Sequence, residues 1–446
     1  MSLLYEKFLS CRGVTTDTRT LQGGEMFFAL KGENFDGNAY AMKALEAGAA
    51  YAVVDQGSAY DGASDRIIAV PDTLQALQDL ARCHRERSQV RGERLTVIGL
   101  TGTNGKTTTK ELIRRVLACK YKVTATEGNL NNDIGVPLSL LKITPETEIA
   151  VIEMGANHPD DIARLVSVAE PDYGLITNVG KAHLLGFGSF EGVQRAKGQL
   201  YDYIAEKGKA VFLNVDDPVL SAMAASRPGL SVIPYGIQHW NALVLPSDAQ
   251  HPFLRMAVPE DVSDSDCLLG IETHLAGAYN ANNVLAALAI GLYFGVSLDE
   301  AIQAVGEYVP ANSRSQLAHS GSNVLILDAY NANPTSMAAA LDNLAQVQAP
   351  RRAALLGDMR ELGADSVKEH VAVLEKLSGM GLDCVCLVGE EFHKALSQCP
   401  IQAEWFATSE DLAKRLPALA FADTAILVKG SRGIQMEKVL TAFPLS

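Results

Sequence analysis

The segment 95–113, LTVIGLTGTNGKTTTKELI, constrains the possible fold of this chain more than any other stretch. An apolar strand runs into a turn of Gly, Thr and Asn, and a helix is predicted to begin near Lys106. The first N–H groups of a helix have no partner within it and carry partial positive charge, so they favour an anion. Glycines let the backbone come close to that anion. Strand, turn and helix together predict a phosphate-binding loop in an α/β sheet.

The glycine spacing departs from the usual phosphate loop, G-x-x-x-x-G-K-[ST]. Counted back from Lys106, the first glycine of that pattern falls on Leu100. The glycines stand instead at Gly99, Gly102 and Gly105. Lys106 can still reach terminal phosphates, and the Thr107 hydroxyl can ligate Mg²⁺. The residues alone predict ATP or GTP phosphates with Mg²⁺; the structural alternative is a tight turn between a strand and a helix.

Apolar strands alternate with helical segments after this loop, which predicts a mostly parallel sheet with helices on both faces. The predicted strands lie at 148–154, 173–177, 209–214 and 231–236. Short hairpins are expected from about 241 to 275, then helices from about 280 and from Leu298. The alternation restarts with strands, each followed by a helix, at 323–330, 351–358, 383–390 and 424–431. A second doubly wound domain is therefore predicted at the C-terminal end.

The first part of the chain predicts a small α/β unit, and the basic, polar stretch 85–94 reads as a linker. The fold class is thus α/β with three domains. They are a small N-terminal domain at 1–92, a central parallel-sheet phosphate-loop domain at 93–309, and a C-terminal Rossmann-like domain at 310–446.

Composition excludes several classes of function. A formal net charge of −14 argues against a broad nucleic-acid surface. No apolar run approaches the ~20 residues of a membrane span, and the first residues lack a signal-peptide pattern, so we expect a cytoplasmic protein. Cys384 and Cys386 form a C-x-C pair, but no second pair or nearby histidine completes a four-ligand metal set. We expect buried, reduced thiols.

Three side chains in the segment after the loop are candidates for chemistry beside it. Glu153 ends a predicted strand, and open α/β sheets bind ligands at the carboxyl ends of their strands. His183 follows a second strand that ends at Asn178, and it is either a metal ligand or a structural histidine. Lys197 lies in a predicted helix and, taken alone, indicates a solvated surface lysine.

The loop G-T-N-G-K-T-T closely resembles that of the Mur ligase family and of the related folylpolyglutamate synthases, which are ATP-dependent amide ligases. The resemblance covers nearly the whole chain. Its most specific stretches are GNLNNDIGVPLSLL (128–141), EMGANHPDDI (153–162), DAYNANPTSM (328–337), LGDMRELG (356–363) and KGSRGIQME (429–437). They are most similar to the branch that adds D-alanyl-D-alanine to UDP-N-acetylmuramoyl-tripeptide.

The resemblance implies an ATP-dependent ligase of peptidoglycan precursor synthesis that acts as a cytoplasmic monomer and forms an acyl phosphate. ATP and Mg²⁺ are the implied cofactors, and the UDP-linked tripeptide and D-alanyl-D-alanine are the implied partners. The lysine that matches Lys197 is typically carbamylated in the family, which would turn a cation into an anionic metal ligand. The implied catalytic residues are Lys106, Glu153, His183 and Lys197. The implied Mg²⁺ ligands are Thr107, Glu153, His183 and carbamylated Lys197.

The resemblance also implies binding residues. Those expected at ATP are Gly102, Thr103, Asn104, Gly105, Lys106, Thr107, Thr108, Asn280, Asn283, Arg314 and Asp328. Those expected at the uridine or diphosphate are Thr18, Arg19, Lys31, Gly32 and Asp36. Other expected substrate contacts are Asn129, Asn131, Asn132, Tyr330, Asn331, Asn333, Lys429, Ser431 and Arg432.

The chain departs from the family pattern in three places. Tyr279 stands where a histidine is usual, Asp160-Asp161 where Gly-Glu is usual, and Gln199 where many relatives have an acid. The alternatives are another Mur ligase, a folylpolyglutamate synthase, or a phosphate-loop NTPase that is not a ligase. DAYNANPTSM argues against the folate branch. The third residue of the tripeptide, meso-diaminopimelate or lysine, is left open.

Overall fold

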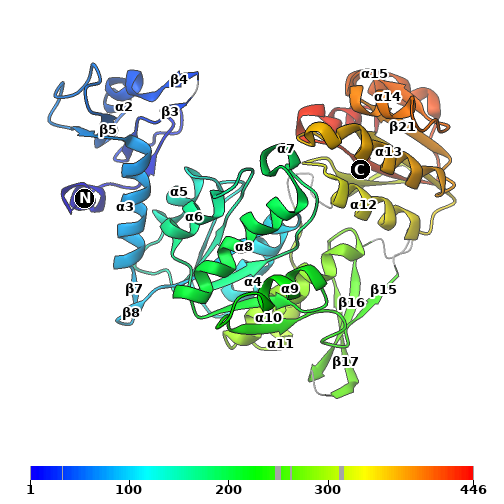
Figure 1. Ribbon diagram of the computed structural model, residues 1–446, viewed down its shortest axis with the longest axis horizontal. Helices are drawn as coiled ribbons and strands as arrows, with labels where there is room; N and C mark the ends of the chain where they lie inside the picture. The colour runs from blue at the N-terminus through cyan, green and yellow to red at the C-terminus, as the bar shows by residue number, and fades with distance from the viewer. Residues whose placement is uncertain (1, 33, 247–252, 262–263, 311–315, 445–446) are drawn as a thin grey trace.

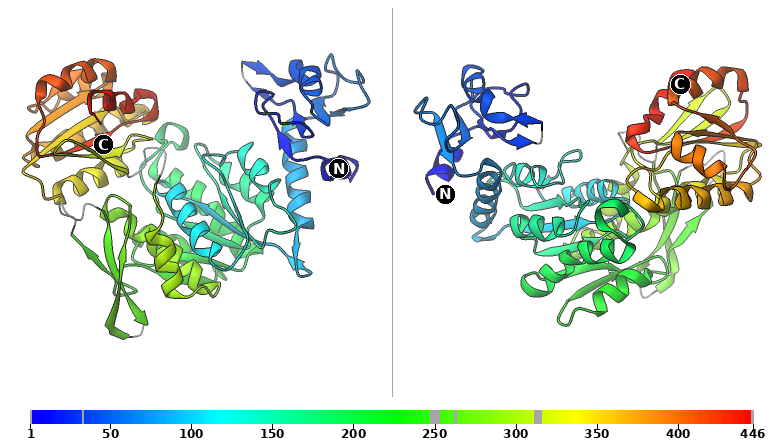
Figure 2. Two further views of the ribbon diagram at one scale, coloured as in Figure 1. Left: turned by 180° about the vertical axis from the view of Figure 1, so that it is seen from behind. Right: turned by 45° about the horizontal axis from the view of Figure 1, so that its top comes forward.

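The computed structural model of the chain describes all residues except 1, 33, 247–252, 262–263, 311–315 and 445–446. Three α/β units follow one another, with the N-terminal unit and the C-terminal unit at opposite ends of the central one (Figure 1). The views from behind and from above keep this order (Figure 2). The predicted three-domain α/β fold is therefore confirmed.

The N-terminal unit is a four-stranded parallel sheet in the order β1-β2-β5-β6. These strands are Val14–Thr15 (β1), Met26–Phe28 (β2), Tyr51–Asp55 (β5) and Ile67–Val70 (β6). The other elements are α1 (Ser2–Leu9), the paired β3 (Lys31–Gly32) and β4 (Phe35–Asp36), the 3-10 helix η1 (Gly37–Tyr40), α2 (Ala41–Glu46) and α3 (Thr73–Arg87). Helix α3 leaves this unit and packs on two helices of the central one (Figure 1).

The predicted linker at 85–94 joins the N-terminal unit to the central one, but it is structured. Helix α3 continues through Arg87, and the hairpin of β7 (Gln89–Val90) and β8 (Glu93–Arg94) follows it. Arg85 is fully buried and donates to Asp172 Oδ2 at 2.8 Å and to the backbone oxygen of Ala169 at 3.3 Å. From the local sequence alone, an arginine is expected to be exposed to solvent. Arg85 is buried instead because its partner, Asp172, lies in the central unit. The connection is a braced helix rather than a flexible tether.

The central unit is a six-stranded parallel sheet in the order β10-β11-β9-β12-β13-β14. Its strands are Thr96–Thr101 (β9), Val123–Ala125 (β10), Ile149–Glu153 (β11), Tyr173–Ile176 (β12), Ala210–Asn214 (β13) and Val232–Tyr235 (β14). The predicted strands are confirmed, and the short β10 was missed. Glu153 pairs in register with Leu100, and Ile176 with Thr101, so these strand ends meet at one edge.

Helices cover both faces of this sheet (Figure 1). The helices α4, α10 and α11 pack together on one face, and α5, α6 and α8 on the other. The central helices are α4 (Lys106–Ala118), α5 (Gly135–Leu140), α6 (Asp161–Ala169), α7 (Leu184–Phe187), α8 (Phe190–Lys207), α9 (Pro218–Ala225), α10 (Ala281–Tyr293) and α11 (Leu298–Gly306), with the 3-10 helix η2 (Ala278–Asn280). The expected hairpins form a three-stranded antiparallel sheet of β15 (Leu243–Leu245), β16 (Arg255–Asp261) and β17 (Asp264–Glu272).

The C-terminal unit is a six-stranded sheet in the order β18-β19-β23-β20-β21-β22, in which only β18 is antiparallel to its neighbour. Its strands are Gln316–Ser320 (β18), Asn323–Asp328 (β19), Arg351–Gly357 (β20), Cys384–Val388 (β21), Glu404–Phe406 (β22) and Thr424–Lys429 (β23). Its helices are α12 (Pro334–Gln346), η3 (Gly363–Asp365), α13 (Ser366–Ser378), α14 (Glu390–Leu396), α15 (Ser409–Arg415) and η4 (Leu416–Leu419). Strand β23 is followed by two 3-10 helices, η5 (Arg432–Ile434) and η6 (Met436–Ala442), and not by the expected α-helix.

The sequence predicted neither a membrane-spanning helix nor a metal site at the Cys384–Cys386 pair, and both predictions can be compared with the described residues. None of their helices has the length and apolar character needed to cross a membrane. Cys384 and Cys386 are free thiols on β21, Cys386 buried, and the described His, Cys, Asp and Glu side chains form no group of three that could hold a metal.

Candidate active site

The predicted phosphate loop joins β9 to α4, and α4 begins at Lys106 as expected. Gly102 and Gly105 both have positive φ, at +150° and +78°. A Cβ on Gly102 would lie 1.9 Å from Thr177 Oγ1, and one on Gly105 would lie 2.8 Å from Asn283 Oδ1. The two glycines are therefore required because neighbouring side chains press directly on the loop.

The end of strand β12 holds this loop in shape. The Asn178 side chain accepts from Asn104 N and donates to Asn104 O, both at 3.0 Å, while Asn178 O accepts from Thr103 N at 3.0 Å. Thr177 Oγ1 donates to Asn104 O at 2.7 Å. Neither Thr177 nor Asn178 was among the predicted site residues. Their position at the carboxyl end of a strand was the signal that could have identified them.

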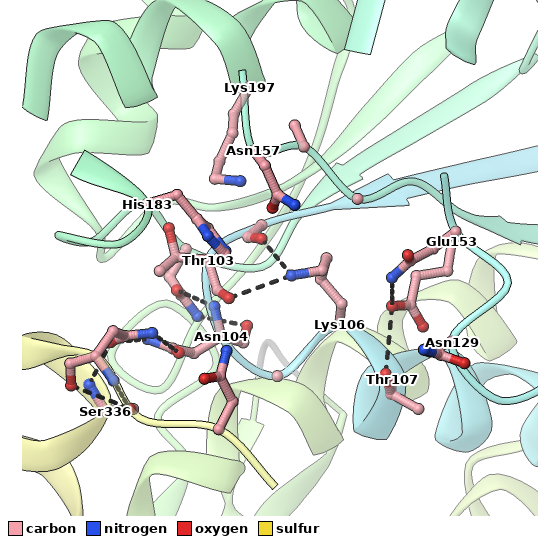
Figure 3. A pocket seen from close by; sticks show the side chains of 18 of the residues that line it. Thr103, Asn104, Lys106, Thr107, Asn129, Glu153, Asn157, His183, Lys197 and Ser336 are labelled. Atoms are coloured by element: carbon pink, nitrogen blue, oxygen red, sulfur yellow. Dashed lines mark hydrogen bonds between the residues drawn. The ribbon is translucent and has the colours of Figure 1, made fainter. Parts of the chain in front are cut away.

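Lys106 and the acid Glu153 line the same cavity; the Lys106 side chain points toward Thr103, and the Glu153 carboxylate points toward Thr107 (Figure 3). Lys106 Nζ donates to the loop carbonyls of Gly102 at 2.8 Å and Thr103 at 3.2 Å. Glu153 is almost fully buried, and its Oε1 accepts from Thr107 Oγ1 at 3.3 Å and from Asn131 Nδ2 at 2.7 Å. Its Oε2 has no hydrogen-bond partner among the described residues.

A hydroxyl beside a buried carboxylate with an unsatisfied oxygen is a donor set that suits Mg²⁺, which prefers hard oxygen ligands. The side chains of Thr107 and Glu153 therefore fit the ion that the loop implies. A buried cation close to Glu153, Lys110, was not predicted from the sequence. Lys110 is fully buried, with its Nζ 4.0 Å from Glu153 Oε2 and 3.0 Å from Glu111 Oε1, and it donates to the carbonyl of Thr126. It lies four residues after Lys106, one helical turn along the same face.

Lys197 is buried and borders the same space, so the solvated-lysine interpretation is wrong. Among the described residues no hydrogen bond or ion pair to its Nζ is found, and the Nζ lies 6.0 Å from the centroid of the Phe187 ring. Burial, reinforced by the charge of Lys106, lowers the pKa of Lys197 well below the usual lysine value. Burial therefore favours the neutral amine over the charged one at this position.

His183 stands beside Lys197 (Figure 3), and its Nδ1 contacts Glu361 Oε2 of the C-terminal unit. Burial lowers the pKa of His183; the Glu361 carboxylate opposes this shift, while Lys106 and Lys197 add to it. The imidazole is thus neutral over a wider pH range than a free histidine.

One cavity of ≈ 800 Å³ unites most of the predicted residues. The predicted residues that line it are Gly102, Thr103, Asn104, Gly105, Lys106, Thr107, Thr108, Asn129, Asn131, Asn132, Glu153, His183, Lys197, Asn280, Asn283, Asp328, Tyr330, Asn331, Asn333 and Lys429. Ser431 and Arg432 line a second, smaller cavity of ≈ 110 Å³, which also borders His183 and Glu361. Arg314 lies outside the described residues.

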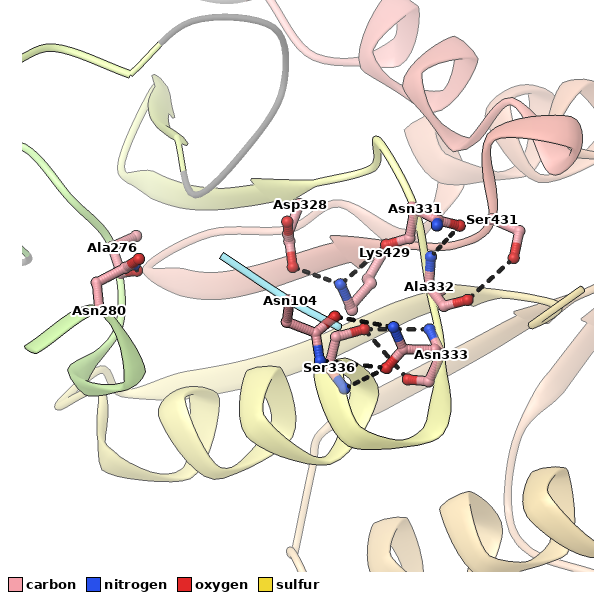
Figure 4. A network of polar contacts seen from close by, with 10 residues as sticks. All are labelled: Asn104, Ala276, Asn280, Asp328, Asn331, Ala332, Asn333, Ser336, Lys429 and Ser431. Carbon is pink, nitrogen blue, oxygen red and sulfur yellow. Dashed lines mark hydrogen bonds and ion pairs between the residues drawn. The ribbon is translucent and has the colours of Figure 1, made fainter. Parts of the chain in front are cut away.

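The C-terminal unit contributes a polar network to the cavity wall (Figure 4). Lys429 is buried, contacts Asp328 in an ion pair across the register of β19 and β23, and donates to Asn331 O at 3.1 Å. Asn333 caps α12 and donates through Nδ2 to Asn104 Oδ1 at 2.8 Å. This bond ties the C-terminal unit directly to the phosphate loop.

Asn280 and Asn283, two of the residues expected at ATP, are engaged in hydrogen bonds within the central unit. Asn280 Nδ2 donates to Ala276 O at 2.8 Å (Figure 4), and Asn283 Nδ2 donates to Asn280 Oδ1 at 2.8 Å. Thr109 Oγ1 donates to Asn283 Oδ1 at 3.0 Å. These bonds brace α10 against the loop helix α4, while both asparagines still border the cavity.

The residues expected at uridine or diphosphate border neither of these cavities. Lys31, Gly32 and Asp36 lie together on the β3–β4 pair, and Lys31 Nζ is 3.0 Å from Asp55 Oδ2. Thr18 and Arg19 lie on the loop after β1, where Asp17 holds the exposed Arg19 at 2.6 Å. The structure therefore separates these residues from the phosphate loop by domain.

Three family descriptions match successive parts of the chain: "Mur ligase family, catalytic domain" at 10–85, "Mur ligase middle domain" at 100–291 and "Mur ligase, glutamate ligase domain" at 313–432. The UDP-N-acetylmuramoyl-tripeptide--D-alanyl-D-alanine ligase of Escherichia coli (strain K12) is 37% identical over 435 residues, which cover 96% of this chain and 93% of that protein. The chain belongs to the Mur ligase family.

Solved structures agree with the family assignment over the whole length. A crystal structure of MurF from Acinetobacter baumannii matches this Mur ligase with a TM-score of 0.85 at 28% identity, covering 99% of this chain and 97% of that one. MurF ligase from Thermotoga maritima, solved in complex with ADP, matches with a TM-score of 0.84 at 27% identity, covering 98% and 97%.

Two departures of this Mur ligase from the family pattern contact each other. Asp160 has a left-handed backbone with φ of 65°, where the usual residue is glycine. Gln199 Nε2 donates to Asp160 Oδ1 at 2.7 Å, and Gln199 Oε1 accepts from Ala163 N at 3.0 Å. The glutamine therefore serves the start of α6. The third departure, Tyr279, borders the main cavity. Its ring packs against Gly277, where a Cβ would lie only 2.3 Å from a ring carbon.

Proposed function

We propose that this Mur ligase joins D-alanyl-D-alanine to UDP-N-acetylmuramoyl-tripeptide in peptidoglycan synthesis, with ATP cleaved to ADP and phosphate. The observation that carries the proposal is the main cavity itself. The phosphate loop forms one wall, and the motifs DAYNANPTSM and KGSRGIQME of the C-terminal unit contribute to the facing wall. The Escherichia coli relative with that activity in its name aligns with 96% of this chain and 93% of its own length.

In the first step a carboxylate oxygen of the tripeptide attacks the γ-phosphorus of ATP, the bond from that phosphorus to the β–γ bridging oxygen breaks, and ADP leaves an acyl phosphate. This step brings two anions together. One such pair of charges at ~4 Å costs roughly 4 kcal/mol at an effective dielectric constant of about 20. That cost equals about three decades in rate. Lys106 and the N–H groups at the start of α4 supply positive charge in the cavity. Thr107 and Glu153 would hold Mg²⁺, which neutralises phosphate charge when it is bound.

In the second step, the free amine of the dipeptide attacks the acyl carbon of the acyl phosphate. The bond from carbon to the phosphate oxygen breaks, phosphate leaves, and the nitrogen loses a proton. Water would destroy this intermediate, so the site must exclude it. The bond between Asn104 and Asn333 supports this role because it holds the C-terminal unit over the loop. Tyr330, Asn331, Ser431 and Arg432 are the proposed contacts of the dipeptide.

We also propose that Lys197 carries a carbamate. An amine attacks carbon dioxide in its neutral form, and the lowered pKa of this buried lysine favours that form. A nitrogen–carbon bond forms, the nitrogen loses a proton to solvent, and the resulting carbamate anion, together with His183 and Glu153, would supply ligands for a second Mg²⁺. At the far end, Thr18, Arg19, Lys31, Gly32 and Asp36 are the proposed contacts of the UDP moiety.

The decisive experiment measures ADP release from ATP with UDP-N-acetylmuramoyl-tripeptide, with and without D-alanyl-D-alanine. We expect release to depend on both acceptor and dipeptide, and the tripeptide's third residue is varied between lysine and meso-diaminopimelate. A parallel panel offers folates and the shorter UDP-linked precursors. Release that needs no acceptor indicates a phosphate-loop NTPase, and release with another panel member transfers the assignment to that ligase.

A further inference from the structure

The central and C-terminal units meet along a seam formed by residues 181–187 and 361–369. Across this seam, Leu185 N donates to Glu361 O at 3.1 Å. Lys181 Nζ donates to Glu369 Oε1 at 2.6 Å. The seam is therefore a specific docking surface with polar bonds at both ends.

Two residues of the seam have a left-handed backbone although neither is glycine. His183 has φ of 51° and Glu361 has φ of 64°. Such conformations cost of order 1–3 kcal/mol and persist where the surroundings fix them, often at functional sites. These two residues contact each other through His183 Nδ1 and Glu361 Oε2. One strained residue from each domain thus meets its counterpart at the edge of the cavity.

This contact indicates which nitrogen of the neutral imidazole carries the hydrogen. A carboxylate only accepts hydrogen bonds, so Nδ1 of His183 is the donor. Nε2 then keeps its lone pair. His183 lines the main cavity together with Lys197, and metal-binding histidines commonly have this arrangement, with one ring nitrogen on a carboxylate and the other on the ion.

We infer that Glu361 is a positioning residue, which the C-terminal unit supplies to orient His183 of the central unit with Nε2 as the ligand. The metal-binding side of the cavity is then complete only when the C-terminal unit is docked. Glu361 belongs to the stretch LGDMRELG, to which the proposed reaction gives no role of its own. The inference rests on the proposed function only in taking His183 as a ligand.

The competing explanation is that Glu361 merely holds the domains together. The seam offers a matched control, because the pair of Lys181 and Glu369 crosses it without touching the imidazole. Glu369→Gln weakens docking alone, whereas Glu361→Ala removes the partner of the imidazole. Glu361→Gln keeps an oxygen that can accept from Nδ1 and serves as the conservative variant.

The first measurement is the ¹⁵N spectrum of histidine-labelled protein without metal, with His183 assigned by its loss in His183→Gln. We expect the Nδ1–H tautomer in the wild type and in Glu369→Gln, and largely in Glu361→Gln. Glu361→Ala should shift toward the Nε2–H tautomer that free histidine favours. An unchanged spectrum in Glu361→Ala, or a wild type with Nε2–H, overturns the inference.

The second measurement is Mn²⁺ binding to protein saturated with a non-hydrolysable ATP analogue and bicarbonate, followed by electron paramagnetic resonance. Removing such a carboxylate typically weakens metal binding by about 10–100-fold, and we expect that loss in Glu361→Ala but not in Glu369→Gln. Equal losses in both variants would mean that docking alone matters and would overturn the positioning role, as would full affinity in Glu361→Ala. Neither measurement uses ligase turnover, so failure of the proposed reaction is detected separately.

Discussion

The two sides of the main cavity are built in different ways. On the loop side, the Asn104 backbone and the Glu153 carboxylate are held by hydrogen bonds within the central unit. On the lysine side, Lys197 is buried with no hydrogen bond to its amine among the described residues, and His183 takes its partner from the C-terminal unit. Folding of the central unit forms the backbone of the first side, and Asn333 of the C-terminal unit then contacts the Asn104 side chain. The second side needs a chemical modification and the docking of another domain.

The difference has a physical reason. A loop that binds phosphate uses its own backbone N–H groups, so folding alone forms the site. Burying an amine without a hydrogen-bond partner lowers the stability of the folded protein. Groups with strongly shifted pKa values cluster at functional sites. The loop side should therefore respond to mutation mainly in activity, and the lysine side in activity and stability together.

The largest expected effect is at the loop. Replacing Lys106 with Ala removes the cation that stabilises the transferred phosphate, and we expect ADP release to fall by about 10³-fold, the scale of one strong electrostatic group. Stability should change little. Lys142→Ala, which removes an exposed lysine paired with Glu127 in the same domain, is the control and should retain turnover. Normal turnover in Lys106→Ala would remove the loop from the reaction.

The lysine side gives the next largest effect. We expect Lys197→Met to abolish ligation and yet raise the melting temperature, because it replaces a buried amine with an apolar side chain of similar length. Mass spectrometry of the intact wild type should show an added carbon dioxide that Lys197→Met lacks. Lys207→Met, on the exposed end of the same helix, is the control. Full activity in Lys197→Met would exclude a carbamate as a ligand.

The same variant predicts how stability depends on pH. The pKa of Lys197 is lowered in the folded protein and ordinary in the unfolded chain, so between these two values the unfolded chain binds more protons. Stability of protein freed of carbon dioxide should therefore rise with pH in that window, by about 1.4 kcal/mol per pH unit. Lys197→Met should lack this slope. Denaturant unfolding at several pH values from neutral upward measures the difference, and parallel curves for the two proteins would contradict it.

Lys110 tests whether the buried Glu153 carboxylate on the loop side needs a neighbouring positive charge. Lys110→Met leaves the carbonyl of Thr126 without its donor and Glu153 without its nearest cation. Breaking a buried pair in this way costs about 3–5 kcal/mol, so we expect a lower melting temperature and weaker Mg²⁺ dependence. Arg115→Met, an exposed cation on the same helix, is the control. A variant as stable as the control would show that the carboxylate needs no counter-charge.

The sequence predicted the loop side well because its signals are local. Strand, glycines, Lys106 and Thr107 are contiguous, and Glu153 is found from the rule that strand ends meet at one edge. It failed wherever a side chain is paired across domains. Arg85 was assigned to a linker although Asp172 buries it, and the contact of His183 with Glu361 joins residues far apart in the chain. Pairings over such distances leave no periodic trace in a single sequence.

The smallest effect concerns the two departures that contact each other, Asp160 and Gln199. Gln199→Glu alone places a second carboxylate against Asp160 Oδ1, so it should destabilise the protein by about 1 kcal/mol, the scale of a near-surface charge pair. Asp160→Gly removes left-handed strain but also an acceptor, so its net effect should be small. Combined, they should cost less than the sum of the single changes, since glycine takes away the repelling group. A double-mutant cycle in denaturant should give a coupling of about 0.5–1 kcal/mol. Additive single changes would mean that the two departures arose independently, and that Gln199 is free to act on the side of Lys197 instead.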